Sequence, residues 1–197
     1  MVSFGRDFAT IKDMGIKRGK WEILSSKIVH KNPYYEVRKD AVIKPDGSQG
    51  FYHVVVLGGA AFTVALDEDM QVYLIGIHRY TNDNYSVEVP GGGLGGQPAL
   101  VAAKRELQEE TGLTAKTWKH LGVTYPADGV VAEENHIFLA TGLTMTSTNE
   151  QKEEGIAETL KVPLKQALGM VKQGTITDQQ SITALTLVAL ELGLLGG

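Results

Sequence analysis

Short apolar runs separated by polar turns occupy much of the first 140 residues of the chain. Runs of this kind, bounded by glycine, proline and asparagine, are typical of β-strands. The pattern predicts strands over residues 21–29, 34–43, 51–57, 60–66, 71–79, 86–89, 118–124 and 136–140. The turn Lys44-Pro45-Asp46-Gly47-Ser48 separates two of these runs. A hairpin is expected there, because proline fixes φ while aspartate and glycine suit the bend.

Three segments show the wider spacing of apolar residues that an α-helix requires. The first follows Pro98 and ends at Gly112, with Leu100, Ala103 and Leu107 recurring on one face. Proline suits the first turn of a helix, and glycine suits the position just past its end. Two more helices are predicted over 163–172 and 179–194, the second with Asp178 as its N-cap.

The first predicted helix carries three glutamates, Glu106, Glu109 and Glu110, beside its apolar stripe. Positions three or four residues apart share a helix face, so these negative charges lie close together and repel one another. Hard divalent cations such as Mg2+ or Mn2+ prefer oxygen ligands and would offset the repulsion. The alternative interpretation is a solvent-exposed face of mixed charge, which Lys104 and Arg105 would share.

The composition of the 197-residue chain is that of a globular protein, with 43% hydrophobic and 21% charged residues. The absence of cysteine excludes a disulfide framework and a thiol nucleophile, and it fits a cytoplasmic location. A net charge of −4 argues against a nucleic-acid partner, because phosphate contacts need clustered basic residues. Residues 1–20 show no signal-peptide pattern and no apolar run is long enough to span a membrane, so no membrane partner is expected.

The glycines before the first helix also form the pattern Gly91-x-Gly93-x-x-Gly96, which matches a dinucleotide-binding fingerprint. That fingerprint requires a parallel sheet of alternating strands and helices. Here several strands and a hairpin precede the glycines, and Pro90 interrupts the approach to them. A phosphate-binding P-loop is excluded as well, because no Gly-Lys-Ser/Thr sequence follows. We therefore expect no dinucleotide cofactor.

The spacing of residues from Gly91 to Leu113 resembles the signature of the Nudix hydrolases. In that signature a glycine is followed, after five residues, by an acidic position and then, after seven more, by Arg-Glu-Leu-x-Glu-Glu-x-Gly-Leu. Residues 105–113 match this last stretch, whereas Gln97 stands in place of the family's first glutamate. The resemblance implies an α+β fold, an α/β/α sandwich with a mixed sheet between helices, preceded by an N-terminal antiparallel β region.

Outside this segment, the chain is most similar to the ADP-ribose pyrophosphatases and related nucleoside diphosphate sugar hydrolases. The pair Arg79-Tyr80, the segment 87–91 and the loop 125–129 resemble motifs of that group. The resemblance implies an N-terminal β region over 1–57 that forms a homodimer, and a Nudix domain over 58–197. The family takes one metal ligand from a main-chain carbonyl just before its signature glycine. Because this chain is one residue shorter there, either Pro90 or Gly91 would supply that carbonyl.

The resemblance also implies roles for the residues of the first predicted helix. Glu106 and Glu110, one helical turn apart, are the expected principal ligands of Mg2+ or Mn2+. Glu109 is expected to share or bridge a cation. Arg105 precedes Glu109 by four residues, so we expect it to orient the carboxylates.

Other candidate residues lie outside this helix. The attacking water needs a base, which the resemblance assigns to Glu133, with the neighbouring Glu134 as the alternative. Arg79 is expected to contact a substrate phosphate, since a guanidinium donates two parallel hydrogen bonds. Glu88 is expected to join the charge network of the metal site or to cap the turn. Trp21 is a candidate for stacking on the base of the substrate, with a core position as the alternative.

Together these residues predict a metal-dependent pyrophosphohydrolase. It would split ADP-ribose or a related nucleoside diphosphate sugar into a nucleoside monophosphate and a sugar phosphate. The alternative is a catalytically weak or silent nucleotide-sugar-binding sensor, because Gln97 lacks the charge of the family's glutamate. The enzyme is favoured, since the three helix glutamates are present and no separate DNA-binding module is apparent.

Overall fold

The computed structural model describes residues 11–146 and 149–194, which form two compact units. The first unit contains the described residues up to Gly58 together with Ala127–Glu133. The second contains Gly59–Pro126 and the described residues from Glu134 onward. Residues 1–10, for which no signal-peptide pattern is expected, lie outside the described part of the chain.

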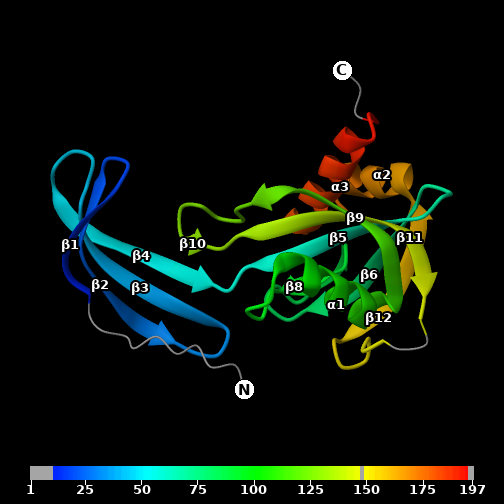
Figure 1. Ribbon diagram of the computed structural model, residues 1–197, viewed down its shortest axis with the longest axis horizontal. Helices are drawn as coiled ribbons and strands as arrows, with labels where there is room; N and C mark the ends of the chain where they lie inside the picture. Colours follow the sequence, from blue (N-terminus) through cyan, green and yellow to red (C-terminus); the bar gives the residue numbers. More distant parts are fainter. Residues whose placement is uncertain (1–10, 147–148, 195–197) are drawn as a thin grey trace. The chain divides into compact units, whose positions relative to one another are not determined.

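The first unit is a single sheet with the strand order β1-β2-β3-β4-β10 (Figure 1). Its strands are β1 (Ile11–Arg18), β2 (Trp21–Lys31), β3 (Tyr35–Ile43), β4 (Gln49–Leu57) and β10 (Val131–Ala132). Neighbours are antiparallel, except that β10 runs parallel to β4. The apolar pattern predicted β2, β3 and β4. It did not predict β1, whose sequence IKDMGIKR contains four charged and three hydrophobic residues.

The predicted hairpin between β3 and β4 is confirmed. The Lys44 N–H donates to the Ser48 carbonyl at 2.8 Å, and the Gly47 N–H donates to the Lys44 carbonyl at 2.9 Å. Asp46 accepts a hydrogen bond from the Ser48 N–H at 2.9 Å. Gly47 has a φ of +82°, which glycine adopts without steric cost.

The second unit contains a mixed seven-stranded sheet whose main path runs β12-β6-β5-β11-β9. Strand β7 pairs with β6, and β8 pairs with β5. Its strands are β5 (Ala60–Leu66), β6 (Gln71–Arg79), β7 (Asn84–Glu88), β8 (Gly91–Gly93), β9 (Leu113–Thr124), β11 (Asn135–Met145) and β12 (Ile156–Pro163). Strands β5 and β11 are parallel, and the other pairs are antiparallel.

Helices cover both faces of β5, which is therefore buried along its length. The helices are α1 (Ala99–Thr111), α2 (Leu164–Gln173) and α3 (Gln179–Glu191). Ala61 and Ala65 pack in apolar clusters with α1, whereas Val64 and Leu66 pack in the cluster that contains α2 and α3. Figure 1 shows α1 on one side of the sheet, with α2 and α3 on the other. The predicted α/β/α sandwich with a mixed sheet is confirmed.

Helix α1 begins after Pro98 and ends at Gly112, as predicted. Its buried stripe differs from the prediction at one position. Ala103 and Leu107 are buried, but Leu100 is 38% exposed, and Ala102 is buried instead. The small Ala102 lets the helix approach the sheet closely, and the larger Leu100 lies outside that contact. None of the described helices combines the length and the apolar character needed to cross a bilayer.

Two segments of the second unit differ from their predicted state. Gly91–Gly93, expected to form a turn, is the short strand β8, while the turn follows over residues 94–98. Glycine has a low strand propensity, so pairing with β5 overrides the local preference. Strand β12 was not predicted, because its sequence IAETLKVP includes two charged residues among its apolar ones.

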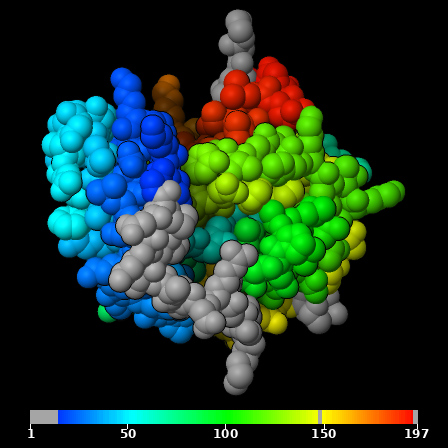
Figure 2. Space-filling view, turned by 60° about the vertical axis from the view of Figure 1, so that its left-hand side comes forward, coloured from blue at the N-terminus to red at the C-terminus, as the bar shows by residue number. Residues whose placement is uncertain are grey.

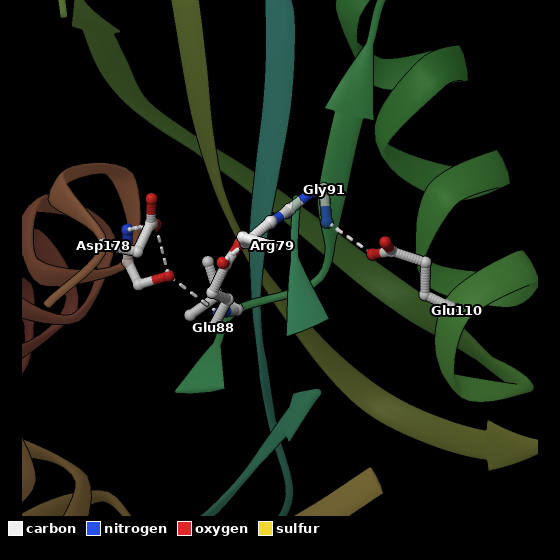
Figure 3. Close-up of polar contacts among 7 residues, drawn as sticks. Arg79, Glu88, Gly91, Glu110 and Asp178 are labelled. Carbon is white, nitrogen blue, oxygen red and sulfur yellow. Dashed lines mark hydrogen bonds and ion pairs between the residues drawn. The ribbon is translucent and has the colours of Figure 1, made fainter. Parts of the chain in front are cut away.

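The N-terminus of α3 is connected to the segment that leads into β8. Asp178 caps α3, as predicted, and accepts hydrogen bonds from the Ser181 N–H and hydroxyl, each at 2.7 Å. The Ser181 hydroxyl also accepts a hydrogen bond from the Val89 N–H at 2.9 Å (Figure 3). Ser181 and Val89 are both buried, so this link anchors the chain two residues before Gly91.

We expect Ser181→Ala to lower the free energy of unfolding by about 1–3 kcal/mol, because the buried Val89 N–H loses its partner. Thr183→Ala is the matched control, since its hydroxyl only donates to the Gln179 carbonyl within the same helix. The control should change stability by less than about 0.5 kcal/mol. Urea unfolding of both variants measures the difference, and equal losses would refute the proposed anchor.

Candidate active site

The candidate site forms where α1 crosses the glycine strand β8. The Gly91 N–H donates to Oε2 of Glu110 at 2.7 Å. A Cβ atom added to Gly92 would lie 2.5 Å from Oε1 of Glu106, which is closer than real Cβ atoms approach an oxygen. A larger residue at this position would have to displace the Glu106 carboxylate, and the two carboxylates lie against the backbone of the strand. This is how the sequence brings its glycines and its glutamates together.

Both carboxylates are withdrawn from water. Glu106 is 7% exposed and Glu110 is 4% exposed. Burial raises the pKa of Glu110 to about 8, although the hydrogen bond from Gly91 opposes this, and the negative charge of Glu106 adds to the rise. Burial also raises the pKa of Glu106, although Arg105 opposes it. A carboxylate that is buried without a cation beside it is unfavourable, so the site favours a positive ligand.

Arg105 holds two of the helix glutamates. Its Nη2 donates to Oε1 of Glu106 at 2.6 Å and to the Gly93 carbonyl at 3.0 Å. Its Nη1 donates to Oε2 of Glu109 at 2.6 Å. Its Nε donates to Oε1 of Gln97 at 3.3 Å. The arginine thus contacts carboxylates and backbone within the site. Its orienting role stays a prediction.

Arg79 and Glu88 form an ion pair that lies between the start of α3 and the contact of Gly91 with Glu110. Nε and Nη2 of Arg79 donate to the two carboxylate oxygens of Glu88 at 2.9 and 2.6 Å. Glu88 is buried; burial alone would raise its pKa, but Arg79 holds the pKa below its ordinary value. Figure 3 shows this pair between Asp178 and the contact of Gly91 with Glu110. Part of the donor capacity of Arg79, which was predicted to contact phosphate, is thus used by Glu88.

Two acidic residues that the sequence analysis missed lie beside the end of α1. One carboxylate oxygen each from Glu109, Glu150 and Glu154 lies within 4.8 Å of the others. The Glu150 N–H donates to the Glu109 carbonyl at 2.8 Å, which fixes this turn against the helix. The charge of Glu154 also acts to raise the pKa of Glu106 and of Glu110. Figure 2 shows α1, in green, at the surface of the second unit.

The remaining candidates have the following positions. Glu133 is half-buried in the first unit, and burial raises its pKa. Glu134 belongs to the second unit, has an exposed side chain and accepts a hydrogen bond from the Ala60 N–H through its carbonyl. Trp21 packs edge-on against Tyr52 in the first unit, with ring centroids 5.4 Å apart.

The carboxylates of the second unit fit a hard divalent cation. They present oxygen atoms, the ligand type that Mg2+ and Mn2+ prefer, from one helix and one adjoining turn. Burial of Glu106 and Glu110 makes a compensating positive charge favourable. The Pro90 carbonyl already accepts a hydrogen bond from the Thr63 N–H at 2.9 Å, although a carbonyl oxygen can accept a second partner.

Comparison with known proteins decides the family. A NUDIX domain matches residues 56–185, which is more than half of the chain, and a nucleoside diphosphate sugar hydrolase N-terminal domain matches residues 21–55. The chain belongs to the Nudix family. The resemblance of residues 91–113 to the family signature is thereby confirmed, and the protein is a Nudix hydrolase.

Two Nudix relatives are similar over most of their length. An ADP-ribose pyrophosphatase of Mycobacterium tuberculosis is 32% identical over 171 residues, which cover 85% of this chain and 83% of the relative. A CMP-5'-(N-acetyl-N-hydroxy-3-aminopropyl)phosphonate hydrolase of Streptomyces rubellomurinus is 31% identical over 174 residues, covering 87% of this chain and 84% of the relative. A crystal structure described as an ADP compounds hydrolase has the same fold, with a TM-score of 0.78 and 21% identity over 92% of this chain and 98% of its own.

We expect Gly92→Ala to weaken binding of Mn2+ to this Nudix site by roughly 10- to 100-fold, because the new methyl group must displace the Glu106 carboxylate. Gly93→Ala is the matched control, since a Cβ atom there meets nothing within 4 Å. Calorimetric titration with Mn2+ gives both affinities, and circular dichroism checks folding. Similar affinities in the two variants would show that the Glu106 contact is unimportant.

The stability of the metal-free protein should depend on pH through Glu110. Its pKa of about 8 lies above the ~4.3 of an unfolded glutamate, so its stabilising contribution is complete at acid pH. That contribution is lost as the pH rises through 8, with a slope of up to about 1.4 kcal/mol per pH unit. In EDTA, the free energy of unfolding should fall from pH 5 to pH 8, and Glu110→Gln should remove most of the fall. An unchanged slope in the variant would contradict this assignment.

Proposed function

We propose that the protein is a divalent-cation-dependent pyrophosphohydrolase that acts on ADP-ribose or a related nucleoside diphosphate sugar. The observation that carries the proposal is the pair of buried carboxylates, Glu106 and Glu110, held against a glycine strand. The names of two relatives, an ADP-ribose pyrophosphatase and a hydrolase of a CMP derivative, support a nucleotide derivative as substrate. The match of residues 21–55 to a nucleoside diphosphate sugar hydrolase domain supports the same class.

Residues of the second unit have different roles in the proposed reaction. A bound Mg2+ or Mn2+ would offset the charge of the diphosphate and lower the pKa of a water molecule. Glu106 and Glu110 would hold the cation, with Glu109 contributing from the same helix. Arg105 orients Glu106 and Glu109 through its two 2.6 Å hydrogen bonds. Arg79 is positioned by Glu88 and directs its remaining N–H groups toward a substrate phosphate.

Two residues are candidates for the base that takes a proton from the attacking water. Glu133 is the residue that the family resemblance suggests, and burial raises its pKa. Glu154 is the candidate that the geometry suggests. Its carboxylate lies within 4.8 Å of that of Glu109, and its charge acts on Glu106 and Glu110. We favour Glu154, because these interactions put it beside the cation ligands.

A cavity in the first unit is our candidate binding site for a nucleobase. Its volume is about 240 Å³, and Trp21, Tyr52, Arg38 and Asp40 are among its lining residues. Trp21 offers an aromatic face for stacking, and Arg38 is held in place by two hydrogen bonds from its Nε to Asp40, at 3.0 and 3.1 Å. We propose that this unit, residues 1–57 in the sequence-based division, also forms a homodimer. The cytoplasmic location and the lack of a nucleic-acid partner remain predictions from composition.

The second candidate function is a weak or silent nucleotide-sugar sensor. The neutral Gln97, in place of the glutamate of the family signature, is the observation that favours it. A sensor would bind ADP-ribose without releasing a nucleoside monophosphate, which separates the two functions in a single experiment.

The decisive test is incubation of the purified protein with ADP-ribose, GDP-mannose, NADH and nucleoside triphosphates, with Mg2+, with Mn2+ or with EDTA. We expect release of a nucleoside monophosphate from a diphosphate sugar only when a divalent cation is present. Binding without product release would support the sensor. Release that persists in EDTA would refute the proposed reaction.

Glu154→Gln should lower kcat by about 100-fold or more if Glu154 is the base. The neighbouring Glu153→Gln is the matched control and should retain activity, because Glu153 is exposed and is not among the clustered carboxylates. Glu133→Gln should then reduce kcat only slightly. The opposite result, a large loss for Glu133→Gln and none for Glu154→Gln, would assign the base to Glu133. Rates at saturating Mn2+ and substrate provide the comparison.

A further inference from the structure

The four partners of Arg105 are unequal in charge and distance. Two are carboxylates, Glu106 and Glu109, and each is 2.6 Å from a terminal nitrogen of the guanidinium. The other two are neutral: the Gly93 carbonyl at 3.0 Å, and the amide oxygen of Gln97 at 3.3 Å. The shortest and strongest hydrogen bonds of the arginine therefore go to residues that are also expected to bind the cation.

The neutral side chain at position 97 determines this distribution. An arginine remains charged at every physiological pH, so its charge must be offset by whichever carboxylates lie within reach. Gln97 reaches the Nε atom but brings no charge. A glutamate at the same place would bring a full negative charge beside Nε, where it would offset part of the charge of the guanidinium. Without it, one oxygen of each of these two carboxylates stays engaged by Arg105.

We propose that Gln97 makes Arg105 an internal competitor of the divalent cation, so that this chain binds its cation weakly and responds to the cation concentration. The proposal rests on the proposed function, because it concerns the same carboxylates. In this chain Arg105 partly occupies the place of a cation at Glu106 and Glu109. Entry of the cation requires that Arg105 release part of its contact with them. Gln97 is thus a positioning residue that acts through Arg105.

The test is Gln97→Glu, which lengthens no side chain and adds one negative charge beside Nε. We expect the variant to bind Mn2+ roughly three- to tenfold more tightly in a calorimetric titration. The Mn2+ concentration for half-maximal hydrolysis should fall by a similar factor. Gln173→Glu is the matched control, because it adds the same charge at the exposed end of α2, on the opposite face of the sheet. Equal or weaker Mn2+ binding by Gln97→Glu would overturn the proposal.

A second pair of variants distinguishes two reasons for tighter Mn2+ binding. Either Arg105 releases Glu106 and Glu109, or the added charge at position 97 attracts Mn2+ directly. In an Arg105→Gln background no arginine competes with the cation. The change in log affinity for Mn2+ caused by Gln97→Glu should then be less than half of the change in the parent protein. An undiminished effect would overturn the competition mechanism. Thermal unfolding in EDTA confirms that each variant is folded before its affinity is compared.

Failure of this inference and failure of the proposed function give different results. Calorimetric binding of Mn2+ does not depend on turnover. If no substrate is hydrolysed, the proposed enzyme is refuted, while the comparison of affinities still tests Gln97. If hydrolysis is observed but the affinities of the parent and of Gln97→Glu are the same, the inference alone is refuted. If neither protein binds Mn2+, the inference is refuted as well.

Discussion

The contact of two buried carboxylates with a strand of glycines is the constraint on which the rest of the structure depends. Glu106 and Glu110 lose most of their hydration, and the negative charges of Glu106 and Glu154 disfavour ionisation of Glu110. Such an arrangement is unfavourable on its own and becomes favourable when a cation binds. A Cβ atom at Gly92 would lie 2.5 Å from the Glu106 carboxylate, and one at Gly91 would lie 2.5 Å from the Ala61 carbonyl of β5. The site is thus set up at some cost to the metal-free protein.

The sandwich positions this contact from both sides of the sheet. Helix α1 reaches the sheet closely because alanines line the interface, and its Glu106 and Glu110 side chains meet strand β8. From the opposite face, the cap of α3 holds Val89 through Ser181, two residues before Gly91. The backbone that meets the carboxylates is therefore anchored by a helix that has no carboxylate in the site itself. Packing of α3 on the face of the sheet opposite α1 therefore influences the position of the Gly91 backbone.

The sequence allowed a correct prediction of those features that depend on local spacing. Helix α1, its terminal Gly112, the cap at Asp178 and the hairpin at residues 44–48 all follow from turn and capping chemistry, and the structure confirms them. Strand β8 was missed because it forms through long-range pairing with β5, and three consecutive glycines do not predict a strand. Glu150 and Glu154 were missed for the same reason: only the folded chain brings this turn to the end of α1. The catalytic, metal-binding and substrate-binding roles of all the candidate residues remain predictions.

The central claim is that the buried carboxyl groups of Glu106 and Glu110 bind a divalent cation, so that Glu110, whose pKa burial raises to about 8, loses its proton when the cation binds. This is tested most directly by the number of protons released when Mn2+ binds at pH 7, measured by calorimetry in buffers of different ionisation enthalpy. With a Glu110 pKa of about 8, roughly one proton should be released per bound cation, and Glu110→Gln should abolish most of that release. Binding of Mn2+ without any proton release would contradict the account.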